Sequence, residues 1–108
     1  MSPQFKQISV DEAKKIIDEF HVTIVDIRDP ESYQAGHLQN AVSVNQNNIE
    51  EFLKTADKKS PLICYCYYGI SSQGAAEYFC QNGFNEALSI EGGFEAWKSV
   101  YPVLKDNV

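Results

Sequence analysis

Basic residues are scarce in this chain, and arginine is the scarcest of them. Nine lysine and arginine residues stand against fifteen aspartate and glutamate residues, which gives a formal net charge of −6, and Arg28 is the single arginine. Such a negative balance repels phosphate backbones and acidic membrane surfaces. We therefore expect neither nucleic acid nor a membrane as a partner.

Long hydrophobic runs and a full set of cysteine pairs are also missing. The longest mostly apolar stretch, residues 62–68, is far shorter than the roughly 20 residues that span a bilayer. Residues 1–9 lack the apolar core of a secretory signal peptide. The three cysteines, Cys64, Cys66 and Cys80, leave at least one thiol unpaired. A reducing, cytoplasmic setting is therefore expected.

What the chain does contain is a regular alternation of apolar runs with helix-patterned segments. The predicted strands cover residues 22–27, 41–44, 62–66 and 87–90. Helical spacing follows a Ser9–Glu12 capping box as far as Phe20, and recurs at 30–35, 49–56, 71–82 and 94–101. This alternation predicts one α/β domain over residues 1–108, with a parallel central sheet of about five strands and helices on both faces.

The clearest chemical feature is Cys66, which stands at the end of a predicted buried strand. A loop containing Gly69 follows it, and Ser71 or Ser72 can cap the next helix. In open α/β sheets, ligands bind beyond the carboxyl ends of the strands. A tight glycine-containing loop can turn successive N–H groups toward an anion, and the helix dipole reinforces that field. A thiol placed there has a lowered pKa, and its thiolate is a nucleophile.

Cysteines can also have structural, metal-binding or phosphatase roles. Most free cysteines are inert small hydrophobic residues, and we expect Cys64 and Cys80 to belong to the core. The Cys64-x-Cys66 spacing lacks two further metal ligands, so no metal site is expected. Phosphatases with a Cys-x5-Arg loop clamp phosphate with the arginine. Here Ser72 stands at that position, so the phosphatase class loses its main anion clamp.

Three ordered segments resemble the rhodanese-like domain family, and most closely its short single-domain bacterial thiosulfate sulfurtransferases of the glycerol-metabolism type. They are residues 25–41 around Arg28-Asp29-Pro30, residues 66–76, and Gly92-Gly93-Phe94-Glu95-Ala96-Trp97. The resemblance implies that Cys66 takes a sulfane sulfur from thiosulfate, or from a persulfide donor, in a ping-pong cycle. A thiophilic acceptor then removes it: cyanide, a thiol, or a dithiol protein such as a thioredoxin. No cofactor is implied.

The same resemblance assigns the site residues. Cys66 is the catalytic residue, and the expected substrate-binding residues are Tyr67, Tyr68, Gly69, Ile70, Ser71, Ser72 and Arg28. Arg28 either steers an anionic substrate or pairs with a neighbouring carboxylate to fix its loop, and the second role is favoured. A competing hypothesis is a non-catalytic rhodanese-like module that binds a protein partner. Such modules generally lack the cysteine, which favours the enzyme.

The loop departs from those relatives in its charge. They usually carry a histidine, an asparagine and a lysine where this chain has Tyr68, Ile70 and Gln73. Because thiosulfate is a dianion, the loss of a nearby cation weakens its expected binding. An aromatic and apolar rim favours a persulfide-bearing protein or a bulkier thiol instead, so the sulfur donor is left open.

Overall fold

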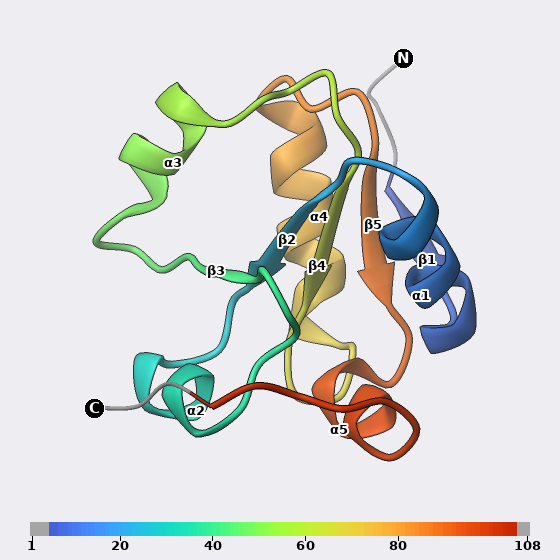
Figure 1. Cartoon of the computed structure of the whole chain (residues 1–108). Helices are drawn as coiled ribbons and strands as arrows, with labels where there is room; N and C mark the ends of the chain where they lie inside the picture. Colours follow the sequence, from blue (N-terminus) through green and yellow to red (C-terminus); the bar gives the residue numbers. More distant parts are fainter. Residues whose placement is uncertain (1–4, 106–108) are drawn as a thin grey trace.

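The computed structural model describes residues 5–105, which form an α/β domain with helices on both faces of a central sheet (Figure 1). The elements in chain order are β1 (Lys6–Ile8), α1 (Val10–Glu19), β2 (Thr23–Asp26), α2 (Pro30–Ala35), β3 (Val42–Ser43), α3 (Ile49–Thr55), β4 (Leu62–Tyr65), α4 (Ser71–Gln81), β5 (Ala87–Ile90) and α5 (Gly93–Lys98). The predicted alternation and fold class are confirmed. The outermost residues of the predicted domain, 1–4 and 106–108, lie outside the described range.

The five strands pair in the order β1-β5-β4-β2-β3, and every pair is parallel. Strand β4 lies at the centre, and all four of its residues are buried. Because parallel strands point the same way, their carboxyl ends meet at one edge of the sheet. The loop that follows β4 lies at this edge between α2 and α5, at the bottom of Figure 1.

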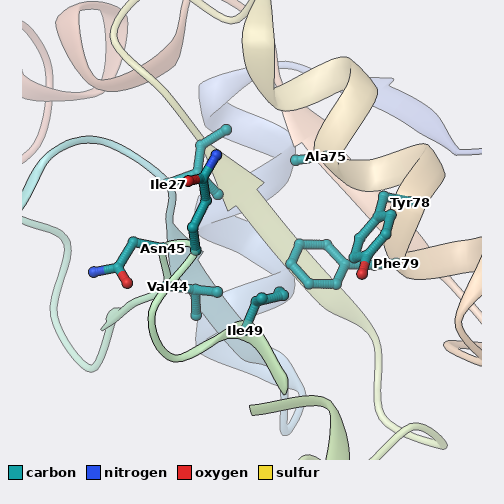
Figure 2. Close-up of a pocket in the computed structure, with 8 residues that line it drawn as sticks. Ile27, Val44, Asn45, Ile49, Ala75, Tyr78 and Phe79 are labelled. Atoms are coloured by element: carbon teal, nitrogen blue, oxygen red, sulfur yellow. The ribbon is translucent and has the colours of Figure 1, made fainter. Parts of the chain in front are cut away.

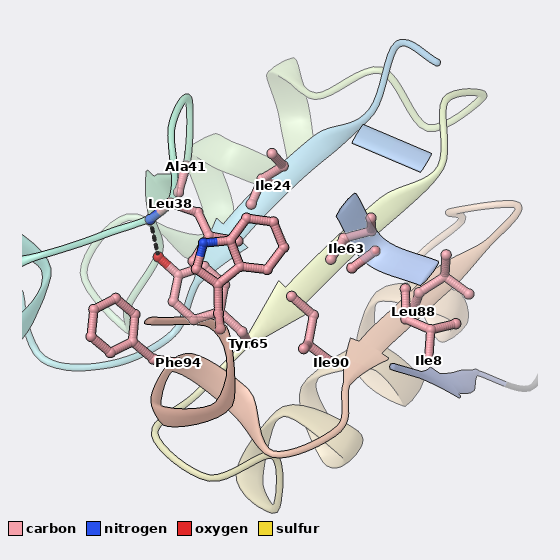
Figure 3. Close-up of a cluster of buried hydrophobic side chains, with 11 residues drawn as sticks. Ile8, Ile24, Leu38, Ala41, Ile63, Tyr65, Leu88, Ile90 and Phe94 are labelled. Atoms are coloured by element: carbon pink, nitrogen blue, oxygen red, sulfur yellow. Dashed lines mark hydrogen bonds between the residues drawn. The ribbon is translucent and has the colours of Figure 1, made fainter. Parts of the chain in front are cut away.

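Each face of the sheet carries its own hydrophobic cluster. One cluster packs beneath α1 and α5 and includes Ile63, Tyr65 and Trp97 (Figure 3). The buried Tyr65 hydroxyl in this cluster has a hydrogen-bond partner, because the N–H of Leu38 donates to it at 3.2 Å. The other cluster lies under α3 and α4 and includes Phe79. Burying a side chain of this size stabilises the fold by about 1.5–3 kcal/mol, so both helix layers are fixed to the sheet.

Three features differ from the sequence-based expectation. Strand β1 was not predicted; it adds an edge to the sheet by pairing Ile8 with Ile90. Phe20 was predicted on the apolar face of the first helix, but that helix ends at Glu19 and the Phe20 side chain is 62% exposed. The backbone at Phe20 is extended (φ −130°, ψ 159°), so the Phe20 side chain does not continue the apolar face of the helix.

The predicted serine cap of α4 is also wrong. The helix begins at Ser71 behind Ile70, and no side chain caps it. Ser72 is instead fully buried. Within the described residues, no helix is long and apolar enough to cross a membrane.

Candidate active site

Cys66 comes directly after β4 and lies at the bottom of a small pocket. Its relative exposure is 6%, and the pocket has a volume of about 220 Å³. The residues that line it are Cys66, Tyr67, Tyr68, Ile70 and Ser71. The fold therefore brings four other predicted site residues to the same pocket as the Cys66 sulfur.

Three hydrogen-bonding groups converge on the Cys66 sulfur. The N–H groups of Gly69 and Ser72 donate to Sγ at 3.2 and 3.3 Å. The thiol itself donates to the Ser72 hydroxyl oxygen at 3.4 Å. Hydrogen bonds to the charged form of a group favour that form, so the two N–H donors stabilise a thiolate.

The pKa of Cys66 reflects two opposing causes. Burial raises the pKa of the thiol, while hydrogen bonds from the Ser72 side chain and from the main chain of Ser72, Gly69 and Tyr68 lower it. The hydrogen bonds prevail, and the pKa of Cys66 is lower than that of an ordinary cysteine. Burial alone would have left an unreactive thiol.

The loop after β4 holds this shape because the first turn of α5 donates hydrogen bonds to its carbonyl groups. The N–H groups of Phe94 and Glu95 donate to the carbonyl oxygens of Cys66 and Tyr67 at 2.8 and 3.1 Å. With its carbonyls engaged on that side, the loop presents its N–H groups to the sulfur. The first turn of α5 thus fixes which way the peptide groups of the loop face.

Two glycines allow the start of α5 and the loop after Cys66 to lie in close main-chain contact. A Cβ atom on Gly93 would lie 2.6 Å from the Cys66 carbonyl oxygen and 2.7 Å from the Gly69 nitrogen. A Cβ atom on Gly69 would lie 2.7 Å from the Gly92 nitrogen. Both residues also have a positive φ, +60° at Gly93 and +85° at Gly69, which favours glycine.

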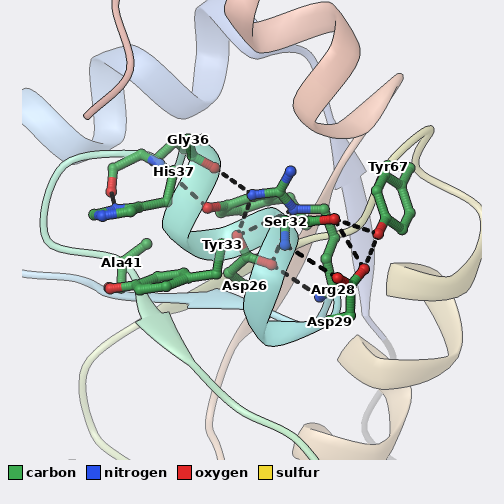
Figure 4. Close-up of polar contacts among 11 residues, drawn as sticks. Asp26, Arg28, Asp29, Ser32, Tyr33, Gly36, His37, Ala41 and Tyr67 are labelled. Atoms are coloured by element: carbon green, nitrogen blue, oxygen red, sulfur yellow. Dashed lines mark hydrogen bonds and ion pairs between the residues drawn. The ribbon is translucent and has the colours of Figure 1, made fainter. Parts of the chain in front are cut away.

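Tyr67 ties the loop to the N-terminus of α2 (Figure 4). Its hydroxyl donates to the Asp29 carboxylate and lies 2.6 Å from the Ser32 hydroxyl. Asp29 also caps α2, because it accepts from the Ser32 N–H at 3.0 Å. The Tyr67 hydroxyl, followed by the Ser32 groups, lowers the pKa of Asp29 to about 2. The aromatic residue next to the cysteine is therefore anchored at its far end.

Arg28 lies next to the ring of Tyr67 and forms an ion pair with the carboxylate of Asp26. Its Nε atom donates to both carboxylate oxygens of Asp26 at 3.1 Å, and Nη2 donates to Asp26 at 2.6 Å and to the Gly36 carbonyl at 2.5 Å. The guanidinium carbon also lies 3.9 Å from the ring centroid of Phe94. The carboxylate pairing considered from the sequence is present, with Asp26 as the partner. Arg28 lines a neighbouring hollow that it shares with Tyr67, and not the pocket over Cys66.

The other two cysteines belong to the core, as predicted. Cys64 and Cys80 are buried and unpaired, and burial raises the pKa of both thiols. The Cys64 thiol donates to the main-chain carbonyl of Ser72 at 3.3 Å. Across residues 5–105, no cluster of three or more histidine, cysteine or acidic side chains could hold a metal ion.

One residue of the site was missed from the sequence. Ser89 lies on β5 with no exposed surface, and its hydroxyl is 2.7 Å from the hydroxyl of Ser72. The available signal was a lone serine inside the apolar run Ala87–Ile90. A buried hydroxyl needs a hydrogen-bond partner, but the sequence alone did not show which one.

A larger apolar groove lies beside α4 (Figure 2). Its volume is about 310 Å³, and it is lined by Ile27, Val44, Asn45, Gln46, Ile49, Ala75, Tyr78 and Phe79. This lining contains no cysteine and no charged side chain. Since it offers no nucleophile for the predicted chemistry, the smaller pocket over Cys66 is the candidate active site.

The fold and the site define a small parallel α/β domain with an activated cysteine in a loop of main-chain donors. The model of the rhodanese-like domain family matches residues 9–100. The chain belongs to this family.

Named relatives and solved structures agree with this assignment. The chain is 43% identical over 102 residues to the thiosulfate sulfurtransferase GlpE of Pseudomonas paraeruginosa, covering 94% of this chain and 92% of that protein. It is 40% identical over 103 residues to the protein of the same name from Coxiella burnetii, covering 95% and 96%. A crystal structure of a rhodanese-like domain protein from Staphylococcus aureus superposes with a TM-score of 0.75 at 33% identity, over 86% of this chain and 91% of that one.

Proposed function

We propose that this protein is a thiosulfate sulfurtransferase that carries sulfur as a persulfide on Cys66. The observation that carries the proposal is the pair of N–H groups, from Gly69 and Ser72, at 3.2 and 3.3 Å from one sulfur atom. The same donors that favour a thiolate also favour a terminal persulfide anion. The names of the relatives support the same activity and the same donor.

The proposed cycle has two steps, and both move sulfur between nucleophiles. The Cys66 thiolate attacks the outer sulfur of thiosulfate and forms a new S–S bond. The S–S bond of thiosulfate breaks, and its electron pair leaves on sulfite. An acceptor then attacks the outer sulfur of the persulfide, and Cys66 departs as a thiolate. The first step needs no general base, because the attacking Cys66 sulfur is already deprotonated. In the second step the acceptor attacks as an anion, either cyanide or a thiolate, and neither step involves a cofactor.

Cyanide and thiols take the sulfur in different forms. Cyanide accepts it as thiocyanate, while a single thiolate becomes a new persulfide. A dithiol completes the transfer by releasing the sulfur as sulfide, with both of its own thiols oxidised to a disulfide. The dithiol route suits a reducing cytoplasm, which stays a prediction for this chain.

The rim of the pocket supports a protein or a bulky thiol as a natural sulfur donor or acceptor. Tyr68 and Ile70 are 67% and 75% exposed beside the cysteine. No lysine or arginine lines the pocket, and the net charge of −6 repels a free dianion at long range. Exposed aromatic and aliphatic residues are typical of the surfaces that bind protein partners. A thioredoxin-like dithiol protein fits this rim.

Arg28 has an indirect role in this proposal. Its charge is neutralised by Asp26 at 2.6 Å, so the pair exerts little net attraction on an incoming anion. We assign Arg28 to holding the segment that carries Asp29, and through it the anchor of Tyr67. Main-chain N–H groups are left as the principal anion donors of the pocket.

The alternative is a module that uses this loop only to bind a partner. Docking alone needs neither a thiol with a lowered pKa nor two N–H groups aimed at it. The geometry around Cys66 therefore favours the enzyme.

Intact mass spectrometry of the reduced protein mixed with thiosulfate tests the proposal. The wild type should gain one sulfur atom that cyanide removes. Cys66→Ser should gain none, and Cys80→Ser, which changes a buried core thiol, should behave as the wild type. Absence of sulfur on the wild type with both thiosulfate and an organic persulfide would refute the sulfurtransferase proposal. Sulfur gained only from the persulfide would refute thiosulfate as the donor.

A further inference from the structure

Ser89 is a polar side chain in a place where the sheet is otherwise apolar. It lies between Leu88 and Ile90 on β5, and none of its surface is exposed. Burying a hydroxyl without a hydrogen bond is costly. Its partner is the hydroxyl of Ser72, at 2.7 Å.

Ser72 links this buried hydroxyl to the reactive sulfur. It is itself fully buried, and its Oγ atom lies 3.4 Å from the Cys66 sulfur. A chain of hydrogen bonds therefore connects the Cys66 sulfur to the Ser72 hydroxyl and the Ser72 hydroxyl to the Ser89 hydroxyl. It leads from the floor of the pocket into the core, away from solvent.

The direction of these hydrogen bonds depends on the state of the sulfur. A serine hydroxyl has one proton to donate and two lone pairs to accept with. When Cys66 is a thiol, its S–H donates to Ser72, and the Ser72 proton can point to Ser89. When Cys66 is a thiolate, the Ser72 proton is needed at the sulfur. The hydroxyl of Ser89 can then turn and donate to Ser72.

We propose that Ser89 is a positioning residue for sulfur transfer, which acts on the Cys66 thiolate and persulfide through Ser72. This inference rests on the proposed role of Cys66 as the sulfur carrier. When Cys66 is charged, the Ser89 hydroxyl donates to the Ser72 oxygen. The Ser72 proton is then free to point at the sulfur, and the Ser72 hydroxyl becomes a more polarised donor. Successive hydrogen bonds in a poorly solvated interior strengthen one another in this way.

A second serine provides a comparison within the same sheet. Ser43 lies on β3, and its buried hydroxyl has no hydrogen-bond partner among the described residues. Replacing Ser43 with alanine therefore removes a buried hydroxyl without changing the hydrogen bonds that connect Ser89 to Cys66. It is the matched control for Ser89→Ala.

The test is the pH dependence of Cys66 alkylation by iodoacetamide, with the modified residue located by peptide mapping. Below the midpoint of the profile, Ser89→Ala should react about two- to tenfold more slowly, because the net worth of one hydrogen bond corresponds to that range. Its midpoint should move to higher pH, while Ser43→Ala should match the wild type. Coincident profiles for Ser89→Ala and wild type would overturn the inference.

A second pair of variants separates hydrogen bonding from packing. Ser89→Thr and Ser89→Val add nearly the same volume, but only threonine keeps the hydroxyl. Threonine should restore the wild-type midpoint, and valine should leave it raised. Equal profiles for the two would show that packing alone accounts for the effect. Alkylation needs no sulfur donor, so this result is independent of whether thiosulfate loads the wild type.

Discussion

Gly93→Ala tests how α5 holds the loop that follows Cys66. A Cβ atom at this position would lie 2.6 Å from the Cys66 carbonyl oxygen, 2.7 Å from the Gly69 nitrogen and 2.8 Å from the Tyr67 carbonyl carbon. All three neighbours are main-chain atoms, so none can move without moving the loop. The φ of +60° adds strain for any residue with a side chain.

The expected loss of stability can be worked from these contacts. A left-handed backbone costs a residue other than glycine about 1–2 kcal/mol. Pushing the loop away breaks the hydrogen bonds from Phe94 and Glu95, each worth about 0.5–1.5 kcal/mol net. Alanine also lowers the conformational entropy of the unfolded chain, which offsets this loss by about 0.4–1 kcal/mol. We expect a net decrease of about 1–5 kcal/mol in the free energy of unfolding.

Urea unfolding measures this change, and sulfur uptake measured by mass spectrometry reports on the site. Gly93→Ala should take up sulfur at least about tenfold more slowly under conditions where it is folded, since misplaced donors cost transition-state stabilisation. Gly74→Ala is the matched control, because its Cβ atom meets nothing within 4 Å. Lying inside α4, it should gain about 0.5–1 kcal/mol. A Gly93→Ala protein with wild-type stability and uptake would refute the account of how α5 shapes the loop.

Three further predictions address the nucleophile, its neighbour and the buried ion pair. Cys66→Ser should abolish sulfur uptake measured by mass spectrometry while its circular dichroism matches the wild type. Tyr67→Phe should raise the pKa of Asp29 from about 2 toward its ordinary value, measured by NMR titration. Because the folded pKa of Asp29 is depressed, its stabilising effect is complete above the unfolded pKa and is lost as pH falls toward 2. Asp26→Ala should lower the free energy of unfolding by about 3–5 kcal/mol in urea, because it leaves the buried guanidinium of Arg28 without its carboxylate.

Local signals in the sequence accounted for most of the fold. The Ser9–Glu12 capping box marked the start of α1, and both of its hydrogen bonds are present. Pro30, a residue type favoured in the first turn of a helix, marked the start of α2. The apolar run ending at Cys66 placed this cysteine at the carboxyl end of a buried strand. Each of these signals depends on residues within a few positions of one another.

The features that were missed depend on contacts made far along the chain. Strand β1 has two polar residues out of three, and it exists because β5 offers a free edge for pairing. Ser72 looked like a helix cap because serine favours that position. The proximity of Ser89 and Cys66 instead turned it inward. No local pattern indicates that residues 72 and 89 meet.

The same distinction between local and long-range contacts separates the main-chain donors of the loop from the side chains at its rim. The donors that reach the Cys66 sulfur come from the main chain at Gly69 and Ser72. We expect substitutions at Tyr68 and Ile70 to leave those N–H groups in place, because the hydrogen bonds from α5 to the loop carbonyls orient the peptide groups. What the rim changes is the surface that an incoming donor or acceptor meets. We therefore expect the reactivity of Cys66 to depend on Gly69 and Gly93 and on the hydrogen bonds from α5, and the choice of partner to depend on the exposed side chains of Tyr68 and Ile70.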